Sequence, residues 1–162
     1  MKTFSKVFFF FVFIFLTIPL LCDDFSINIY YLHGEKSKDS HSSTEKITIN
    51  NFDITYSVKY SGHNEKSNFE KEKSCTFTDK EINSIKETII DKRINITDSI
   101  FSEGSKTKSF ERFFNINIEF VLDDVKTIIK MNGDTDELED TDLYKKSIIL
   151  ISLIRNMIQE CK

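Results

Sequence analysis

The side chains best suited to acid–base or metal chemistry are three histidines, His33, His41 and His63. Imidazole titrates near neutral pH and is the commonest metal ligand in proteins. A zinc site needs three or four convergent ligands, and these spacings match none of the familiar zinc patterns. All three histidines lie in polar segments. The sequence therefore predicts solvated loop histidines that are candidates for binding a partner, and it predicts no metal site.

An acidic stretch, residues 133–142 (GDTDELEDTD), holds six carboxylates. Calcium takes oxygen ligands, but the glycine and the closing glutamate of an EF-hand loop are in the wrong places here. Acidic residues also favour the N-terminus of a helix, where Asp or Thr caps the free N–H groups. We therefore interpret this stretch as the approach to a helix.

Two cysteines, Cys75 and Cys161, remain if the N-terminal segment with Cys22 is removed. An even pair in an exported domain predicts a disulfide. Its formation requires the two Cα atoms to lie within roughly 7 Å. Because Cys75 precedes one predicted helix and Cys161 ends another, the bridge predicts that these helices run antiparallel. The alternative, a reactive thiol, has no CxxC motif and no nearby histidine to support it.

Motifs for modification and catalysis are few. Asn95-Ile96-Thr97 is an N-glycosylation acceptor, which predicts a glycan at Asn95 if the chain enters a eukaryotic secretory path. The chain contains no Gly-x-Ser-x-Gly elbow, no HExxH and no phosphate-binding loop. We therefore assign no catalytic residue and no cofactor. Catalytic groups can also converge in space without a sequence motif, so an extracellular hydrolase is kept as an alternative.

The N-terminus has the layout of a secretory signal peptide, with basic residues, an apolar run over residues 7–21 and then two aspartates. Fifteen helical residues span only about 22 Å, against roughly 30 Å of hydrocarbon. The prediction is a signal peptide over residues 1–22, cleaved after Cys22. The alternative is a lipoprotein acylated at Cys22, although Leu21 is large for the preceding position. A retained or lipidated N-terminus would make a surface-anchored structural protein.

Charge narrows the classes of partner. The formal net charge is −4, and removal of Lys2 and Lys6 with the signal peptide makes it −6. Nucleic acid and anionic lipid should both be repelled by such a chain. The sequence therefore predicts no nucleic-acid partner, and no membrane association unless Cys22 is lipidated.

Alternation of apolar and polar residues predicts strands over residues 25–31, 47–60, 113–122 and 125–131. Asn50–Asn51 divides the second range into a short and a long strand, and Asp123–Asp124 is a predicted tight turn. Three polar segments are predicted as loops: 33–46, 61–74 and 98–109.

Two helices are predicted. Thr78 and Glu81 form a capping box, and isoleucines at helical spacing follow to about Arg93, with a short extended exit over residues 94–96. A second helix runs from near residues 140–142 to about Glu160. Its segment 147–154 (SIILISLI) is apolar nearly all round, which favours burial between the sheet and the first helix. The alternative is a second apolar face that binds another protein, including a second copy in a homodimer.

The order of these elements favours an α+β fold, with an antiparallel sheet of four to five strands and two antiparallel helices packed on one face. About 140 residues suit one domain, so residues 23–162 are predicted to be a single unit. The predicted function is that of a secreted protein-binding module, inhibitor-like in its class, with an extracellular protein as partner.

Overall fold

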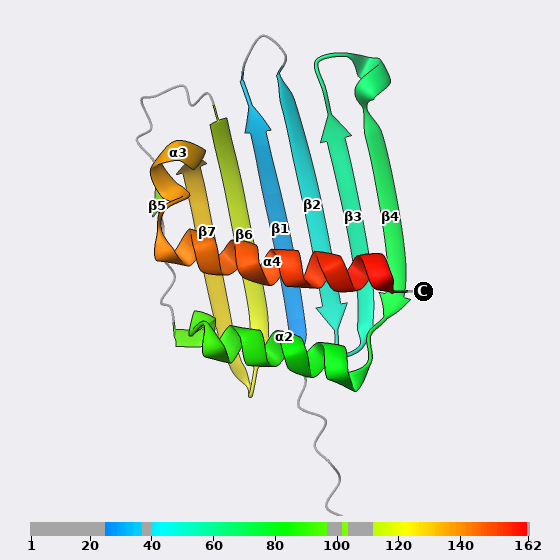
Figure 1. Ribbon diagram of the computed structural model, residues 1–162, viewed down its shortest axis with the longest axis vertical. Helices are drawn as coiled ribbons and strands as arrows, with labels where there is room; N and C mark the ends of the chain where they lie inside the picture. The colour runs from blue at the N-terminus through cyan, green and yellow to red at the C-terminus, as the bar shows by residue number, and fades with distance from the viewer. Residues whose placement is uncertain (1–24, 37–39, 97–101, 104–111, 162) are drawn as a thin grey trace, which may run out of the picture.

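The computed structural model describes residues 25–36, 40–96, 102–103 and 112–161 of the chain (Figure 1). The predicted signal peptide, Thr97 and most of the predicted loop 98–109 lie outside the described residues. In chain order the elements are β1 (Ser26–Glu35), β2 (His41–Asn50), β3 (Asp53–Ser61), the 3-10 helix η1 (Glu65–Ser67), β4 (Phe69–Thr76), α2 (Asp79–Asp91), the 3-10 helix η2 (Ile94–Ile96), β5 (Ser102–Glu103), β6 (Arg112–Leu122), β7 (Val125–Asp134), α3 (Thr135–Leu138) and α4 (Asp142–Glu160).

One sheet contains all the described strands, in the order β4-β3-β2-β1-β6-β7-β5. The six long strands are antiparallel to their neighbours, and two-residue β5 pairs parallel with β7. The α+β class is therefore confirmed, whereas the prediction of four to five strands was too low.

The extra strand length comes from segments 33–46 and 61–74, which were wrongly predicted as loops. The β1–β2 ladder continues to the pair Glu35 and His41, and residues 69–76 form the edge strand β4. These segments are polar because much of their surface faces solvent. Polar residues occupy both faces of these segments, so the sequence shows no alternation of apolar and polar residues there. Their backbones nevertheless continue the hydrogen-bonded pairing of the strands.

Both long helices lie across the same face of the sheet, and Figure 1 shows them running in opposite directions. We call this the helix-side face, and the other the open face. The core between the layers is mostly isoleucine and phenylalanine, including Ile27, Ile47, Ile85, Ile118, Phe120 and Ile154, each at most 1 % exposed. The antiparallel pair of helices predicted from the cysteines is therefore present.

Local signals placed the helix starts and turns well. Thr78 and Glu81 form the predicted capping box at the start of α2. Asn51, Asp123 and Asp124 have positive φ angles at the two hairpin turns, as their types allow. The predicted extended exit at residues 94–96 was wrong, because these residues form the 3-10 helix η2. The short helix α3 was not predicted.

Helix α4 is apolar nearly all round because it touches more than the sheet. Leu150, Ile151 and Ile154 are fully buried, and α4 also contacts α2. Ile148, Leu153 and Met157 are partly buried against the same core, which leaves Ile149 as the exposed isoleucine of the helix, at 45 %. Packing on two sides therefore accounts for most of its apolar surface.

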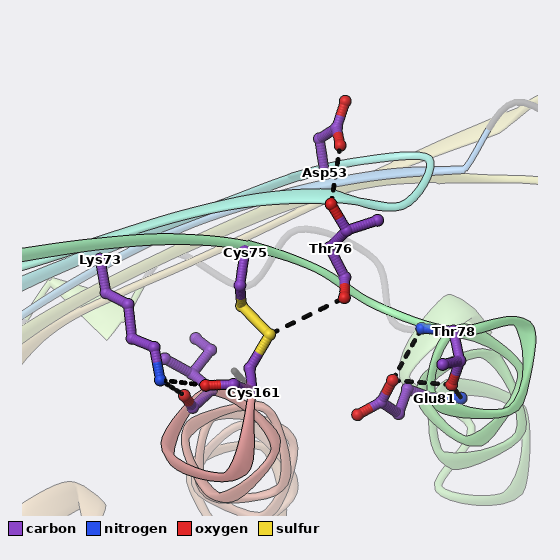
Figure 2. The surroundings of a disulfide bond; sticks show 8 residues. Asp53, Lys73, Cys75, Thr76, Thr78, Glu81 and Cys161 are labelled. Carbon is purple, nitrogen blue, oxygen red and sulfur yellow. Dashed lines mark hydrogen bonds between the residues drawn. A yellow bond between two sulfur atoms is a disulfide. The ribbon is translucent and has the colours of Figure 1, made fainter.

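The C-terminal end of α4 is fastened to the edge strand. Cys75 of β4 and Cys161 form the predicted disulfide, with Cα atoms 6.3 Å apart. Figure 2 shows Lys73 beside the bridge, where its Nζ donates to the carbonyl oxygens of Ile158 at 2.6 Å and Cys161 at 2.5 Å. A cation therefore satisfies carbonyl groups at the negative end of the helix dipole. Cys75 precedes α2 as predicted, and it belongs to the strand β4.

Within the described residues, the helices include none that combines the length and the apolar character needed to cross a bilayer.

Candidate functional site

The helix-side face of the sheet is covered at one end and bare at the other. In Figure 1, α2 crosses one end of the strands and α4 crosses near their middle, so the far ends of β1 to β4 have no helix in front of them. Along the helix-side positions of β1, the residues change from Ile27 and Ile29 to Tyr31, His33 and Glu35. The composition therefore changes from aliphatic to aromatic and polar where the helix cover ends.

A buried ion pair marks this boundary. Arg155 of α4 donates from Nε and Nη2 to the two carboxylate oxygens of Glu45 on β2, at 2.6 and 2.7 Å. The Glu45 side chain is only 10 % exposed and that of Arg155 is 28 % exposed. Two-point pairing of a planar guanidinium with a carboxylate fixes orientation as well as distance. The pair therefore sets the position of α4 against the bare end of the sheet.

Aromatic and imidazole rings surround this pair. The guanidinium of Arg155 lies 5.4 Å from the centre of the Tyr31 ring, and the His33 ring stacks on Tyr31 at 5.0 Å. Burial raises the pKa of Tyr31 and of Tyr56, and it lowers the pKa of His33. At neutral pH His33 is therefore uncharged, with one ring nitrogen available as an acceptor.

A row of stacked rings continues across the neighbouring strands. His41 of β2 stacks with Tyr60 of β3 at 6.2 Å, and Tyr60 stacks with Phe69 of β4 at 5.4 Å. Phe69 is 46 % exposed, and it is the one aromatic residue among the exposed large hydrophobic residues of the described chain. Lys71 places its ammonium over the Phe69 ring at 5.5 Å. We call His41, Tyr60 and Phe69 the aromatic shelf.

A pocket opens beside the shelf, where β1, β2 and β6 meet the start of α4. Its volume is about 260 Å³, and we call it the histidine pocket. It is lined by Tyr31, His33, Gly34, Glu35, His41, Arg112, Phe113, Thr135 and Tyr144. His41 belongs to both features, so the aromatic shelf and the histidine pocket form one continuous surface.

Gly34 is required by close packing at this place. A Cβ atom on Gly34 would lie 2.6 Å from the carbonyl oxygen of His41 and 2.6 Å from the ring of Phe113. Only glycine leaves room for both neighbours. The bare end of the hairpin β1–β2 is therefore closely packed despite its polar sequence.

The structure separates the three predicted histidines. His33 and His41 meet at the histidine pocket, and both lie on strands, so their assignment to loops was wrong. His63 is exposed in the connection between β3 and η1, away from the pocket lining. Across the described residues, no three side chains of His, Cys, Asp or Glu are arranged to hold a metal ion.

The acidic stretch has the structural role expected of it. The Asp134 side chain accepts from the backbone N–H of Asp136 at the start of α3, at 2.9 Å. Thr141 does the same for the N–H of Tyr144 at the start of α4, at 3.3 Å. Its residues therefore begin two helices in succession.

Asn95, the predicted glycan acceptor, lies in η2 and is partly buried. Its Oδ1 atom is buried without a hydrogen-bond partner. Thr97, which completes the acceptor motif, lies outside the described residues, so glycosylation at Asn95 stays a prediction.

A second concavity, of about 350 Å³, extends from the open face beside β4. Serine, threonine and lysine residues dominate its lining, with Glu72 and Tyr56 beside them. It contains no histidine, and short hydroxyl side chains on an exposed sheet are ordinary surface. The bare end of the helix-side face is the stronger candidate site.

The sequence missed most residues of this site, including Tyr31, Glu45, Tyr60, Phe69 and Arg155. One signal was present: the period-two pattern of β1 continues through Tyr31 and His33 to Glu35. The pairing of Glu45 with Arg155 joins positions 110 residues apart and leaves no local trace in the sequence.

Comparison with protein-family models and with curated proteins finds no match for this chain. The geometry of the site therefore supplies the basis for a functional proposal.

Proposed function

We propose that the chain is an exported protein-binding module that contacts an extracellular protein through the aromatic shelf and the histidine pocket. The observation that supports this is the bare, aromatic end of a sheet face whose other end is fully covered. Tyrosine and arginine are enriched at the energetic centres of protein interfaces, and aromatic residues in their cores. Here Tyr60 stacks on the exposed ring of Phe69, and Arg155 lies over the ring of Tyr31.

Export is part of the proposal and rests on two features. Residues 1–22 have the layout of a signal peptide. The disulfide between Cys75 and Cys161 is compatible with an oxidising compartment, where such bridges persist. A mass measurement of the secreted, non-reduced protein would report the cleavage point, the bridge and any glycan at Asn95 together.

The binding surface is tested by capture from the medium into which the protein is secreted. We expect the wild-type protein to retain a specific partner, and a Tyr60→Ala, Phe69→Ala double variant to lose it. Val125→Ala is the matched control, because Val125 is 59 % exposed at the β6–β7 turn, at the opposite end of the strands. Equal recovery by the shelf variant and the control would contradict the proposed surface, and no recovery by the wild type would contradict the function.

An inhibitor-like role is the narrower form of the same proposal. It predicts that the captured protein is an extracellular enzyme whose activity falls when the module is added in stoichiometric amount. A captured protein without enzymatic activity would leave the binding function and remove the inhibitor interpretation.

The hydrolase alternative receives less support from the geometry. It required a serine or aspartate beside His33 or His63 in a concave site. Ser43 is the cross-strand neighbour of His33, but it is buried and does not line the histidine pocket, whose described lining contains neither serine nor aspartate. A homodimer through α4 and an anchor at Cys22 remain predictions, the first testable by solution mass and the second by mass of the mature N-terminus.

A further inference from the structure

From the charges and acceptors of the histidine pocket we infer that it receives an arginine side chain of the partner protein. This inference rests on the proposed function, since it names the chemistry recognised at the same surface. The size of the cavity is the first support. About 260 Å³ is smaller than the pockets that bury drug-sized ligands, and it suits a single long side chain.

The unpaired charge of the pocket is negative. Glu35 lines it and has no ion-pair or hydrogen-bond partner in the described part of the chain. Arg112 is the cross-strand neighbour of Glu35, but its guanidinium turns to Asp136 at 2.6 Å and to Glu139 at 4.0 Å. The cation that could have neutralised Glu35 is therefore held by carboxylates on and beside α3.

Further acidic groups extend this field beyond the pocket. The acidic stretch 133–142, from which α3 and α4 begin, carries six carboxylates. Two of them, Asp140 and Asp142, form salt bridges to lysine. Lys36, at the rim, is placed over the Phe113 ring at 5.6 Å from its centre. A cationic side chain that approaches this corner meets an excess of negative charge, which favours its association.

The polar groups of the lining are mostly acceptors or can act as acceptors. The lining includes Glu35 with its carboxylate, uncharged His33, and the hydroxyl-bearing residues Thr135, Tyr31 and Tyr144, of which the two tyrosines are hydrogen-bonded to each other. A guanidinium presents five N–H donors in one plane, whereas an ammonium presents three donors at a point. Several acceptors spread around a small cavity therefore favour arginine over lysine.

The aromatic rings of the lining add to this preference. Tyr31, Phe113 and Tyr144 are the aromatic residues of the lining. Two of these rings already lie near cations of the chain itself, Tyr31 near Arg155 and Phe113 near Lys36. Guanidinium stacks on aromatic faces more readily than ammonium does.

The test measures binding of Nα-acetyl-arginine amide to the disulfide-bonded protein by NMR, from the ring signals of His33 and His41. We expect saturable shifts at millimolar concentration, with weaker binding of the lysine analogue. The citrulline analogue has nearly the same shape without the charge, and it should bind at least about tenfold more weakly. Equal shifts with citrulline, or tighter binding of lysine, would overturn the assignment to arginine.

Two variants locate the site. Glu35→Gln should weaken arginine binding by at least about tenfold, and Tyr144→Phe should weaken it severalfold while keeping the ring. Glu87→Gln is the matched control, because Glu87 is exposed on α2 and its loss changes the net charge equally. Unchanged affinity in Glu35→Gln, in a protein whose thermal unfolding matches the wild type, would exclude this pocket. If arginine fails to bind while the shelf variant still loses its partner, this inference fails and the proposed function stands.

Discussion

The two ends of the helix-side face use the same strands for different purposes. At the covered end, cross-strand neighbours are aliphatic, as in the set Ile29, Ile47 and Ile118. At the bare end, His33 pairs with Ser43 and Ser43 pairs with Tyr60, whereas Phe114 on β6 beside His33 is still buried. The covered end gains free energy from burial of apolar area, at roughly 25 cal/mol per Å². The bare end keeps the exposed ring of Phe69 and the partly buried His33, His41 and Tyr60 at the surface, where a partner can contact them.

The boundary between the two ends is fixed by α4. The bridge from Cys161 to Cys75 and the contacts of Lys73 hold its C-terminal end to β4, and Arg155 holds its middle to Glu45 on β2. Because α4 is fastened at these places, it cannot slide along the strands to cover the shelf. The difference between the ends is therefore built into the fold, and it can be tested piece by piece.

Removal of the bridge should have the largest effect. A Cys75→Ala, Cys161→Ala variant frees a loop of 86 residues in the unfolded chain, so we expect a loss of about 4 kcal/mol in the free energy of unfolding. Urea unfolding under non-reducing conditions measures this, and reduction of the wild type should reproduce it. A loss below about 1 kcal/mol would mean that α4 is held mainly by packing.

Truncation of a side chain should cost more unfolding free energy at the covered end than at the bare end. Ile118 is fully buried at the covered end, and Ile118→Ala should cost about 3 kcal/mol of unfolding free energy through lost burial and a cavity. Phe69→Ala at the bare end should cost under about 1 kcal/mol, because its ring is 46 % exposed. The same urea titration compares them. Similar losses at both sites would contradict the separation of a structural end from a binding end.

Breaking the ion pair at the boundary should have a smaller effect. Arg155→Met leaves the carboxylate of Glu45 buried without its partner, and we expect a loss of about 2 kcal/mol at pH 7. A second change, Glu45→Met, should restore stability at pH 7. If the single variant were as stable as the wild type, α4 would not depend on this pair.

Sequence reasoning succeeded where a signal was local. The capping box at Thr78 and Glu81, the turn at Asp123 and Asp124 and the apolar stripe of α4 each lie within a few residues. The disulfide was inferred from the even number of cysteines in a domain predicted to be exported, and it in turn predicted that the two helices are antiparallel. The capping box, the turn and the stripe are encoded by neighbours in the chain, so they could be identified without the fold.

The bare end could not be predicted because its strands lack a hydrophobic face. In β2, the helix-side positions His41, Ser43 and Glu45 are indistinguishable from loop residues when the sequence is examined alone. They are strand residues because β1 pairs with all three and β3 pairs with Ser43 and Glu45 on the other side. Two of the three predicted histidines, His33 and His41, line one pocket, and their convergence depends on a cross-strand register that only the fold supplies.

The smallest effect concerns the charge of His33 at the bare end. Glu45 and His41 of β2, Arg155 of α4 and Tyr31 of β1 are its charged and titratable neighbours, and burial is the main cause that lowers its pKa. The unfolded chain therefore binds a proton at His33 more readily than the folded chain does. Below the ordinary value of 6.5 the folded state loses stability as pH falls, and above it this contribution is constant.

A His33→Gln variant tests this sign directly. Urea unfolding between pH 7 and pH 5 should show a shallower decline for the variant than for the wild type, while His63→Gln, at an exposed turn, should follow the wild type. NMR titration of the His33 ring should place its pKa below the ordinary histidine value of 6.5. A steeper decline in His33→Gln would mean that the folded state prefers the charged ring, and the bare end would then favour an anionic partner over a cationic one.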